Sequence, residues 1–352
     1  MKIVHIVYSL EFGGIETMLV NIVNEQISMG HDIGIICINN AINSGLREAI
    51  DKKVKLYCIG RPIGSKNPYY LLKFNYKLYS LKSDIIHVHS PSITRYILFN
   101  LLKGKMCTTR HAPHNPIESN YLPYFKYIYS ISNSVREDEI KNMNIDSKVI
   151  LNGVNVSNIK SKINLSEFNA PLKLIQVSRI NHLIKGQHIL IQAIKIVKEG
   201  GYNISVDFIG DGPSFDYLTE QIKKLGLENE VKLLGAKSQQ YIFEHLCEYD
   251  LFVQPSIYEG FGLTVAEAMA AKIPVLVSEN QGPLEIIDNG KYGYSFKNGD
   301  ANDCADKIIN IIEQGVDLDM INAAYKRVEE LYSVQQTARN YINEYKLILE
   351  NR

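Results

Sequence analysis

Two glutamates and two glycines surround the start of a helical segment in the stretch SIYEGFGLTVAEAMA. Gly260 and Gly262 allow backbone amides to approach an anion, and the N-terminus of the following helix adds partial positive charge. Glu259 and Glu267 offer carboxylate oxygens that accept hydrogen bonds from hydroxyl groups. A capping box, with Thr264 as N-cap and Glu267 bonding back to its amide, is the alternative, but it explains Glu267 alone. The window therefore supports either a capped helix or a site for a ligand that carries an anion and hydroxyls.

Basic residues and further glycines follow other predicted strands. Arg179 and Lys185 lie in SRINHLIKG, where a guanidinium fork and a mobile ammonium suit phosphate oxygens. Gly13 and Gly14 precede a predicted helix and either admit a phosphate to its N-terminus or form a tight turn. No G-x-G-x-x-G follows the first strand, and GDGP at 210–213 lacks the third glycine. An NAD-dependent enzyme is therefore disfavoured.

Several histidines have spacings that invite a metal interpretation. His87 and His89 lie on one face of a predicted strand, and His111 and His114 lie in TRHAPHN. No cysteine or carboxylate cluster accompanies them at ligand spacing, so no zinc site is expected. The single Asp-x-Asp, at 317–319, is interpreted as surface charge. A G-x-S-x-G nucleophile is absent from the sequence.

Composition limits the class of protein. A length of 352 residues with ordinary apolar and charged fractions predicts a globular protein of about two domains. The longest apolar runs fall short of the ~18 residues that a membrane-spanning helix needs. The first ten residues predict a buried strand rather than a signal peptide. The five cysteines are scattered and predict neither a disulfide framework nor a zinc knuckle, so a cytoplasmic protein is expected: Cys37, Cys58, Cys107, Cys247 and Cys304.

Charge is unevenly distributed along the chain. Residues 1–165 carry 20 Lys and Arg and 12 Asp and Glu, a net charge of +8, whereas 166–352 carry 18 and 26, a net charge of −8. Within 61–82, lysines alternate with aromatic residues: Lys66, Lys73, Lys77 and Lys82 among Tyr69, Tyr70, Phe74, Tyr76 and Tyr79. Such a segment attracts an anionic membrane surface; a solvated helix with its tyrosines on the core is the alternative. No nucleic-acid-binding motif accompanies it, so no nucleic acid partner is expected.

The elements that must position these residues alternate in type. Short apolar runs rich in β-branched residues are followed by helical stretches, which predicts an α/β protein with parallel sheets and crossover helices. Two such series occur, separated by a polar stretch at 155–170. We expect two doubly wound domains, over 1–165 and 166–335, with a C-terminal helix over 336–352 that packs back on the first. Ligand sites are expected beyond the carboxyl ends of the strands.

The motifs together resemble the retaining glycosyltransferases of family 4, whose GT-B fold has two facing Rossmann-like domains with a cleft between them. The resemblance covers almost the whole chain and rests on the order and spacing of its motifs: GGxE at 13–16, DIIHVH at 84–89, TRH at 109–111, SISNSV at 130–135, NGVN at 152–155, SRI and KG at 178–186, GDGP at 210–213, LLG at 233–235 and QPSIYEGFGLTVAEAMA at 254–270. There are departures: Asn155 replaces the usual aspartate after NGV, and Ile180 and Asn181 differ beside Arg179.

The resemblance implies a nucleotide-sugar donor held mainly by the C-terminal domain. Arg179 and Lys185 would then bind the diphosphate together with amides at the start of the glycine-rich helix. Glu267 would accept hydrogen bonds from the ribose, and Glu259 from hydroxyls of the donor sugar. The remaining donor contacts implied for this domain are Gly235, Ala236 and Lys237 along the base, and Gly260, Phe261, Gly262, Leu263 and Thr264 at the helix entry.

The N-terminal domain would supply the remaining contacts. The resemblance implies that Gly13 and Gly14 close over the phosphates and that His111 touches the sugar near its anomeric carbon. The basic half would hold the acceptor, a saccharide that is lipid-linked at the inner face of the cytoplasmic membrane, as in O-antigen or capsule synthesis.

The mechanism implied is sugar transfer with retention. Negative charge grows on the leaving nucleoside diphosphate, where Arg179, Lys185 and the helix dipole stabilise it, so neither a metal nor another cofactor is expected. No enzymic nucleophile is evident, which favours front-face attack. A nucleotide-sugar epimerase of similar fold and a non-catalytic sugar-binding homologue are the two alternatives. The sequence leaves the base, the sugar, the linkage and the acceptor open.

Overall fold

The computed structural model describes residues 1–11, 13–98, 100–112, 116–164, 168, 170–279 and 281–351. The chain forms two compact units, an N-terminal unit of Met1–Val154 with Ser333–Arg352 and a C-terminal unit of Asn155–Tyr332. The second boundary falls at 332 instead of the predicted 335, and the first falls earlier than the predicted 165 because the segment after Val154 is held by the C-terminal unit. There, the amide of Lys160 donates to the carbonyl of Phe243 at 3.0 Å.

The N-terminal unit is built on one parallel sheet. Its seven strands are ordered β3-β2-β1-β4-β5-β6-β7, and every pair is parallel. The central strands are buried along their whole length, which their continuous Ile and Val content favours. The strands are β1 Lys2–Val7, β2 Asp32–Asn39, β3 Lys55–Arg61, β4 Ile85–Val88, β5 Met106–Arg110, β6 Tyr127–Ser130 and β7 Lys148–Val149.

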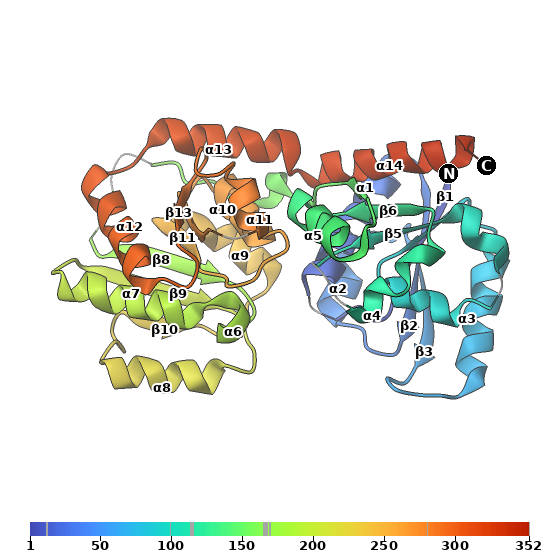
Figure 1. Ribbon diagram of the computed structural model, residues 1–352, viewed down its shortest axis with the longest axis horizontal. Coiled ribbons are helices and arrows are strands. Elements are labelled where there is room, and N and C mark those ends of the chain that lie inside the picture. The colour runs from blue at the N-terminus through green and yellow to red at the C-terminus, as the bar shows by residue number, and fades with distance from the viewer. Residues whose placement is uncertain are drawn as a thin grey trace. The chain divides into compact units, whose positions relative to one another are not determined.

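Helices connect these strands and cover the sheet (Figure 1). Several begin at a side-chain cap that accepts a backbone amide, such as Asn43 before α2, Asn67 before α3 and Ser132 before α5. The helices are α1 Gly14–Ser28, α2 Ser44–Ala49, α3 Pro68–Ser80, α4 Pro116–Ser119, α5 Asn133–Met143 and α14 Val334–Glu350, with short 3-10 helices at Pro91–Tyr96, Asn100–Lys105 and Leu122–Tyr124.

The C-terminal helix α14 belongs to the N-terminal unit and lies beside α1 (Figure 1). Tyr341 and Tyr345 on α14 are fully buried in the core of this unit. The return of the chain is fixed where Val154 bridges to Ser333. A Cβ on Gly153 would lie 2.4 Å from the Ser333 carbonyl oxygen, so the two crossing segments are packed backbone to backbone.

The C-terminal unit is a second parallel sheet with the order β10-β9-β8-β11-β12-β13. Its strands are β8 Leu172–Val177, β9 Ile204–Ile209, β10 Val231–Leu233, β11 Leu251–Gln254, β12 Val275–Ser278 and β13 Tyr294–Phe296. The chain moves from β8 outward through β9 to β10, then returns to the other side of β8 as β11. This reversal puts the topological switch point between β8 and β11, where ligands bind in open α/β sheets.

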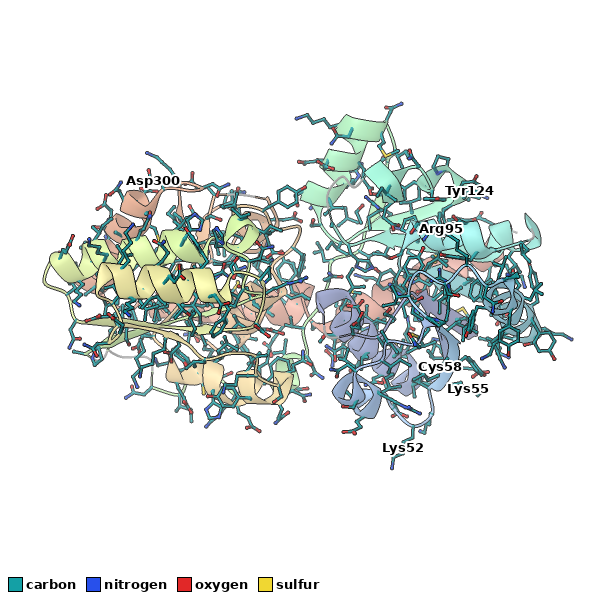
Figure 2. The ribbon with its side chains drawn as sticks, turned by 90° about the horizontal axis from the view of Figure 1, so that it is seen from below. Lys52, Lys55, Cys58, Arg95, Tyr124 and Asp300 are labelled. Atoms are coloured by element: carbon teal, nitrogen blue, oxygen red, sulfur yellow. The ribbon has the colours of Figure 1, made fainter. Side chains whose placement is uncertain are left out.

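Helices complete the C-terminal unit. Asp300 (labelled in Figure 2) starts α12 by accepting the amides of Asn302 and Asp303 at 3.0 Å each, and Asp317 caps α13 in the same way. The helices are α6 His182–Lys185, α7 Gln187–Glu199, α8 Phe215–Leu225, α9 Gln239–His245, α10 Leu263–Ala270, α11 Gln281–Ile286, α12 Ala301–Gln314 and α13 Leu318–Leu331, with 3-10 helices at Val156–Asn158 and Leu246–Glu248. The predicted pair of doubly wound parallel sheets is confirmed.

None of the helices in the described part of the chain has the length and apolar content needed to cross a membrane.

Candidate functional site

The loops that follow β8 and β11 meet at the switch point of the C-terminal unit. The amides of Ile257 and Tyr258 donate to the carbonyl of Ile184, at 2.9 and 3.2 Å. Gly186 has φ +65°, and a Cβ there would lie 1.8 Å from the carbonyl oxygen of Pro255. Only glycine permits this approach of backbone to backbone. The contact places the end of α6 directly against the loop that carries Glu259.

Lys185 and Glu259 form an ion pair between these two loops. The two side chains keep 21% and 18% of their exposed area, so the pair lies at the surface of the loops rather than in the core. The amide of Gln254 donates to Glu259 Oε2 at 3.3 Å and to Ser256 Oγ at 2.8 Å. The sequence named both charged residues as ligand contacts, and the structure brings them together as partners.

Arg179 lies two residues after Val177, the last residue of β8. Its carbonyl accepts from Gln187 Nε2 at 3.0 Å, which fixes the backbone. Its side chain is exposed, and among the residues that the structure describes none forms an ion pair or hydrogen bond with the guanidinium. An arginine whose backbone is fixed and whose guanidinium is accessible is suited to bind an anionic ligand.

Helix α10 begins at Leu263, with Gly262 as its N-cap at φ +101°. The capping box, which the sequence offered as an alternative, does not form. Thr264 is already inside the first turn, and no side chain caps the helix. Glycine takes the N-cap because the backbone there is left-handed, a conformation that threonine avoids. Within the described chain, the amides of Leu263 and Thr264 have no acceptor, so the helix offers donors and partial positive charge at its start.

Phe261 keeps the entry to α10 in place. Its side chain is buried and its ring packs edge-on against Tyr332, with 5.7 Å between centroids. On the other side, a Cβ on Gly282 would lie 2.4 Å from the Cα of Phe261, so α11 packs tightly against the same loop. Gly260 and Gly262 thus belong to a loop fixed from two sides.

Glu267 points into the interior instead of toward the helix start. It is only 9% exposed, and burial raises the pKa of its carboxyl to about 8, which a hydrogen bond from Gln239 opposes. Gln239 begins α9, directly after the predicted base-lining segment of Gly235, Ala236 and Lys237. In that segment the carbonyl of Gly235 accepts from Gly210 at 3.0 Å. The structure therefore brings Glu267 close to the start of the helix that follows this segment.

Buried glutamines support these loops, and the sequence analysis missed them. Gln176 donates to Ser178 Oγ at 3.1 Å and to the carbonyl of Lys185 at 3.0 Å, and Gln187 donates to Ser178 Oγ at 3.0 Å. Gln254 does the same for Glu259 from the end of β11. The signal was present in LIQV and FVQP, where an amide interrupts an apolar strand at its carboxyl end.

In the N-terminal unit, Gly13 is the N-cap of α1 and Gly14 its first residue. A Cβ on Gly13 would lie 2.6 Å from Glu16 Oε2, so the carboxylate folds back over the glycine. Burial raises the pKa of Glu16, which a hydrogen bond to its own amide opposes. An acidic side chain therefore already lies at the position that the sequence assigned to a phosphate.

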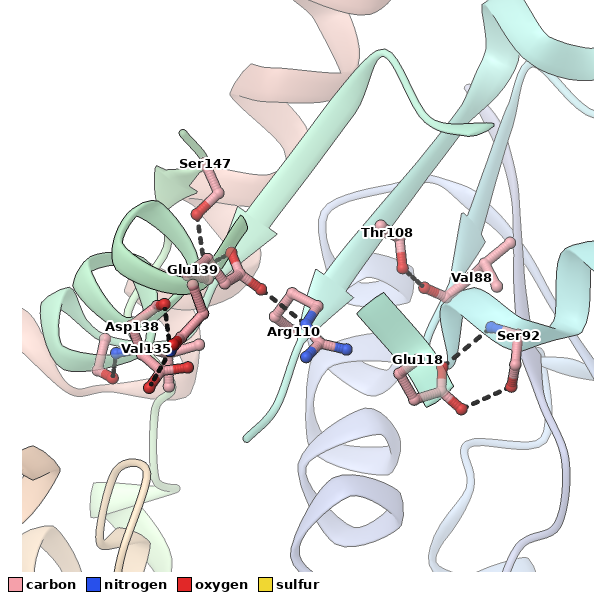
Figure 3. A network of polar contacts seen from close by, with 12 residues as sticks. Val88, Ser92, Thr108, Arg110, Glu118, Val135, Asp138, Glu139 and Ser147 are labelled. Carbon is pink, nitrogen blue, oxygen red and sulfur yellow. Dashed lines mark hydrogen bonds and ion pairs between the residues drawn. The ribbon is translucent and has the colours of Figure 1, made fainter. Parts of the chain in front are cut away.

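His111 follows β5 in the same unit and is partly exposed. The preceding Arg110 donates from Nε to Glu139 Oε1 at 2.6 Å (Figure 3), and both side chains are buried, at 4% and 1% exposure. Ser130 donates to the other carboxylate oxygen at 3.1 Å. This buried pair fixes the end of β5 against α5 and thereby the position from which His111 projects.

Four imidazoles gather at the carboxyl ends of β1, β4 and β5: His5, His87, His89 and His111, hereafter the histidine cluster. The rings of His87 and His89 stack at 4.3 Å and 23°, and those of His89 and His111 at 5.4 Å and 25°. The sequence analysis did not include His5, because its strand is separated from the others in sequence. His114 lies outside the described residues.

Ring nitrogens of His5, His87 and His89 lie within 4.8 Å of one another, a spacing compatible with a metal ion. Both nitrogens of His87 are already engaged, by the Tyr345 hydroxyl at 2.6 Å and by Thr109 Oγ1 at 2.8 Å. The rings stack face to face, whereas ligands direct their in-plane lone pairs at a common point. The geometry thus favours a hydrogen-bonded cluster over a metal centre.

Comparison with known proteins follows the same division of the chain. The family model for Glycosyltransferase Family 4 matches residues 12–158, and the model for Glycosyl transferases group 1 matches residues 158–327. The two models meet where the first unit gives way to the second.

Individual relatives are more distant. The amylovoran biosynthesis glycosyltransferase AmsK of Erwinia amylovora is 32% identical over 166 residues, which cover 45% of this chain and 40% of that protein. Matches with it and two other curated relatives span 16 to 60% of those proteins' lengths.

Solved structures match over the whole chain. The glycosyltransferase of Rickettsia africae ESF-5 superimposes with a TM-score of 0.79 at 22% identity, covering 100% of this chain and 99% of that one. The Anabaena protein HepE, solved with UDP and glucose, gives 0.79 at 20% identity, covering 98% and 99%. These similarities establish the fold. The two family models, which together match residues 12–327, show that the chain belongs to the family-4 glycosyltransferases of GT-B fold.

Proposed function

We propose that the protein transfers a sugar from a nucleotide-sugar donor to a saccharide acceptor, with the donor held by the C-terminal unit. One arrangement carries the proposal. At the switch point of this unit, an open guanidinium, the free amides that begin α10 and a buried carboxyl surround one loop system. A diphosphate flanked by a ribose and a sugar offers the matching anions and hydroxyls.

In this proposal the Lys185–Glu259 ion pair separates when the donor binds. Without donor, the two charges compensate each other at the mouth of the loops. A donor supplies a phosphate for Lys185 and hydroxyl donors for Glu259, so both residues exchange one partner for another of the same kind. Arg179 and the amides of Leu263 and Thr264 take the rest of the diphosphate charge.

We propose the following further contacts with the donor. Glu267 accepts hydrogen bonds from the ribose, and the segment from Gly235 to Lys237 lies along the base. From the N-terminal unit, His111 contacts the donor sugar. Gly13 and Gly14 adjoin the phosphates once the Glu16 carboxylate has moved away.

Bond breaking at the anomeric carbon builds negative charge on the leaving diphosphate. Arg179, Lys185 and the α10 amides are positioned to stabilise that charge electrostatically, so the reaction proceeds without a metal. No carboxylate is assigned as a nucleophile. The acceptor therefore attacks from the face that the diphosphate leaves, its proton passes to the departing phosphate oxygen, and the anomeric configuration is retained.

The acceptor side is proposed from the surface of the N-terminal unit. Helix α3 exposes Tyr69, Leu72 and Tyr76 on one face, at 58%, 62% and 76%, and Ile63 in the preceding loop at 68%. Lys66 and Lys82 are exposed at either end of this helix. Apolar side chains flanked by lysines suit an anionic bilayer surface. We therefore place the protein at the inner face of the cytoplasmic membrane, with a lipid-linked saccharide as acceptor in surface polysaccharide synthesis.

A donor screen followed by a transfer assay tests the proposal. Nucleoside diphosphates and their sugars are first ranked by the shift in melting temperature, which rises with the ratio of ligand concentration to Kd. Release of nucleoside diphosphate from the best donor is then followed with saccharide acceptors, with and without EDTA. Transfer that persists in EDTA with an unchanged anomeric configuration is expected. Donor turnover equal in the presence and absence of acceptor would indicate an epimerase, and tight binding without turnover a sugar-binding homologue.

A further inference from the structure

A chain of hydrogen bonds connects the surface position His111 to a buried glutamine. Gln26 Oε1 on α1 contacts His5 Nε2 at 2.8 Å, and His5 Nδ1 contacts His89 Nε2 at 3.0 Å. His89 Nδ1 then contacts His111 Nε2 at 3.2 Å. Gln26, His5 and His89 are buried at 0 to 3% exposure, and His111 alone reaches the surface. The sheet brings these residues together from three separate strands and a helix.

The positions of the protons follow from the chemistry of each partner. A carbonyl oxygen only accepts, so His5 Nε2 must carry the proton that it shares with Gln26. A neutral imidazole has one donor and one acceptor, so His5 Nδ1 accepts and His89 Nε2 donates. By the same reasoning His89 Nδ1 accepts and His111 Nε2 donates. The other ring nitrogen of His111, Nδ1, is then left as an acceptor.

We propose that Gln26 is a positioning residue that sets the tautomer of His111 through two buried histidines. The chain presents Nδ1 of His111 as an acceptor for a sugar hydroxyl. The second statement rests on the proposed function, whereas the first concerns the protein without any ligand.

The orientation of the Gln26 amide decides the direction of the whole chain. In the structure Gln26 Oε1 faces His5 Nε2 at 2.8 Å, and Gln26 Nε2 is buried with no hydrogen-bond partner among the described residues. An amide turned the other way would direct an N–H at His5 Nε2, which would then have to accept. The oxygen that faces His5 therefore sets the direction of the chain.

The surroundings keep the rings neutral. Burial lowers the pKa of His5 to about 4 and that of His111 to about 3, and it holds the pKa of His89 well below the usual range. The titratable groups that face the chain are His87, Tyr341 and Tyr345, together with Arg110, whose charge is paired with Glu139. Among the described residues, no carboxylate hydrogen-bonds to the four rings.

Replacing the terminal acceptor by a carboxylate should reverse the chain. In a Gln26→Glu variant the new charge stabilises a doubly protonated His5, whose Nδ1 becomes a donor. His89 must then accept at Nε2 and donate at Nδ1, and His111 must do the same. One substitution on α1 thus moves the proton on His111 from Nε2 to Nδ1, three hydrogen bonds away.

The test uses the full-length protein labelled with ¹⁵N-histidine, without donor. Long-range ¹H–¹⁵N spectra at neutral pH should show Nε2–H on His5, His89 and His111 in the wild type. They should show the order of the two ¹⁵N shifts of His111 reversed in Gln26→Glu. Asn21→Asp, which adds the same charge elsewhere on α1, is the control and should leave the wild-type pattern. Gln26→Met should leave His111 as a mixture of tautomers, which keeps the test usable if the Glu variant does not fold.

Three outcomes would overturn the proposal: an Nδ1–H tautomer of His111 in the wild type, a Gln26→Glu variant in which His5 gains its charge while His111 keeps its shifts, and a stoichiometric metal ion bound by the rings. Because the readout needs neither donor nor turnover, failure of the transfer assay leaves this result intact, and the reverse also holds.

Discussion

The two units solve the problem of holding polar groups in place in opposite ways. The N-terminal unit packs neutral imidazole rings against one another in its interior and joins them by hydrogen bonds, and its Arg110–Glu139 ion pair is buried at 4% and 1% exposure. At its switch point the C-terminal unit leaves charge accessible, with an ion pair at 21% and 18% exposure and an exposed Arg179 beside it, although its Lys162–Asp250 pair is more deeply buried, at 16% and 3%. Burial fixes orientation around the histidine cluster, and the proposed donor site has accessible charge.

The difference follows from the energetics of charge. A buried ion pair stays fixed because separating its members leaves an uncompensated charge in the protein interior. A pair that solvent still reaches contributes less to stability than a fully buried one, so a ligand can displace one partner at a smaller cost. Substitutions that exchange these properties test whether the contrast is real.

The largest expected effect is the loss of the buried pair. Arg110→Met leaves Glu139 buried without its cation and should lower the free energy of unfolding by about 3–5 kcal/mol. Lys185→Met should lower it by at most about 1 kcal/mol, because solvent reaches Glu259. Urea denaturation followed by circular dichroism measures both. Arg110→Met combined with Glu139→Leu removes both charges and should recover most of the loss. Equal losses in the two single variants would erase the contrast.

Turnover should show the reverse order. Arg179→Ala or Lys185→Ala removes a charge-assisted contact to the leaving group, which costs about 1.5–3 kcal/mol or roughly 10- to 150-fold in kcat. Because the stabilised charge grows in the transition state, donor affinity should change less than kcat. Lys173→Ala removes the same charge from the opposite end of β8 and should be neutral. The assay is the initial rate in EDTA. Wild-type activity that requires magnesium or manganese would contradict this prediction, because a metal ion would then stabilise the leaving group in place of Arg179 and Lys185.

The outer surface of the N-terminal unit should bind anionic vesicles. Lys66→Gln with Lys82→Gln should weaken binding by about 2 kcal/mol, at roughly 1 kcal/mol for each lysine near the surface. Lys52→Gln with Lys53→Gln removes two charges elsewhere on this unit (Lys52 in Figure 2) and serves as the control. Co-sedimentation at rising salt measures the effect, which screening should diminish. Equal binding to neutral vesicles would contradict it.

A further effect concerns Glu267 and depends on pH. Its folded-state pKa of about 8 lies above the ordinary 4.5, so the stability it contributes is complete below pH 4.5 and is lost as pH rises through 8. Glu267→Gln should therefore melt at a higher temperature than the wild type at pH 8.5, with the difference vanishing near pH 4.5. Glu220→Gln, an exposed change on α8, should show no such trend.

Donor binding should couple to the same proton. In the proposed site ribose hydroxyls donate to the carboxylate, so wild-type affinity should rise between pH 6 and 8 and binding should release a proton. Calorimetry in two buffers of different ionisation enthalpy measures that release. Glu267→Gln should bind about fivefold more weakly at pH 8, a cost of roughly 1 kcal/mol, and lose the pH dependence. An identical pH slope in the variant would place the proton on another group.

The sequence predicted the fold and the loops of the site because both depend on short-range patterns. Apolar runs alternating with helices predicted two parallel sheets, and the glycine-rich entry to α10 predicted donors at a helix start. It failed where the outcome depends on contacts distant in sequence. Nothing near Glu267 indicates that Gln239 approaches it, and nothing near Lys185 indicates that Glu259 is its partner.

The capping box does not form for a different reason. Thr264 and Glu267 have the residue types and spacing of the motif, but Gly262 adopts a left-handed backbone and is the N-cap, two residues before Thr264. The histidine cluster is missed for a third reason. His5 joins it only because β1 lies beside β4 in the sheet order, which a strand-by-strand interpretation does not provide.

The late return of α14 has a consequence for how the chain is made. Residues 1–154 leave the ribosome first, yet the core around the histidine cluster is completed by Tyr341 and Tyr345. At about 5–20 residues per second, synthesis of the intervening 155–332 takes roughly 10–35 s. During that interval the first sheet lacks the apolar side chains of α14 that cover its core. The unit translated first is therefore completed only after the second has been made.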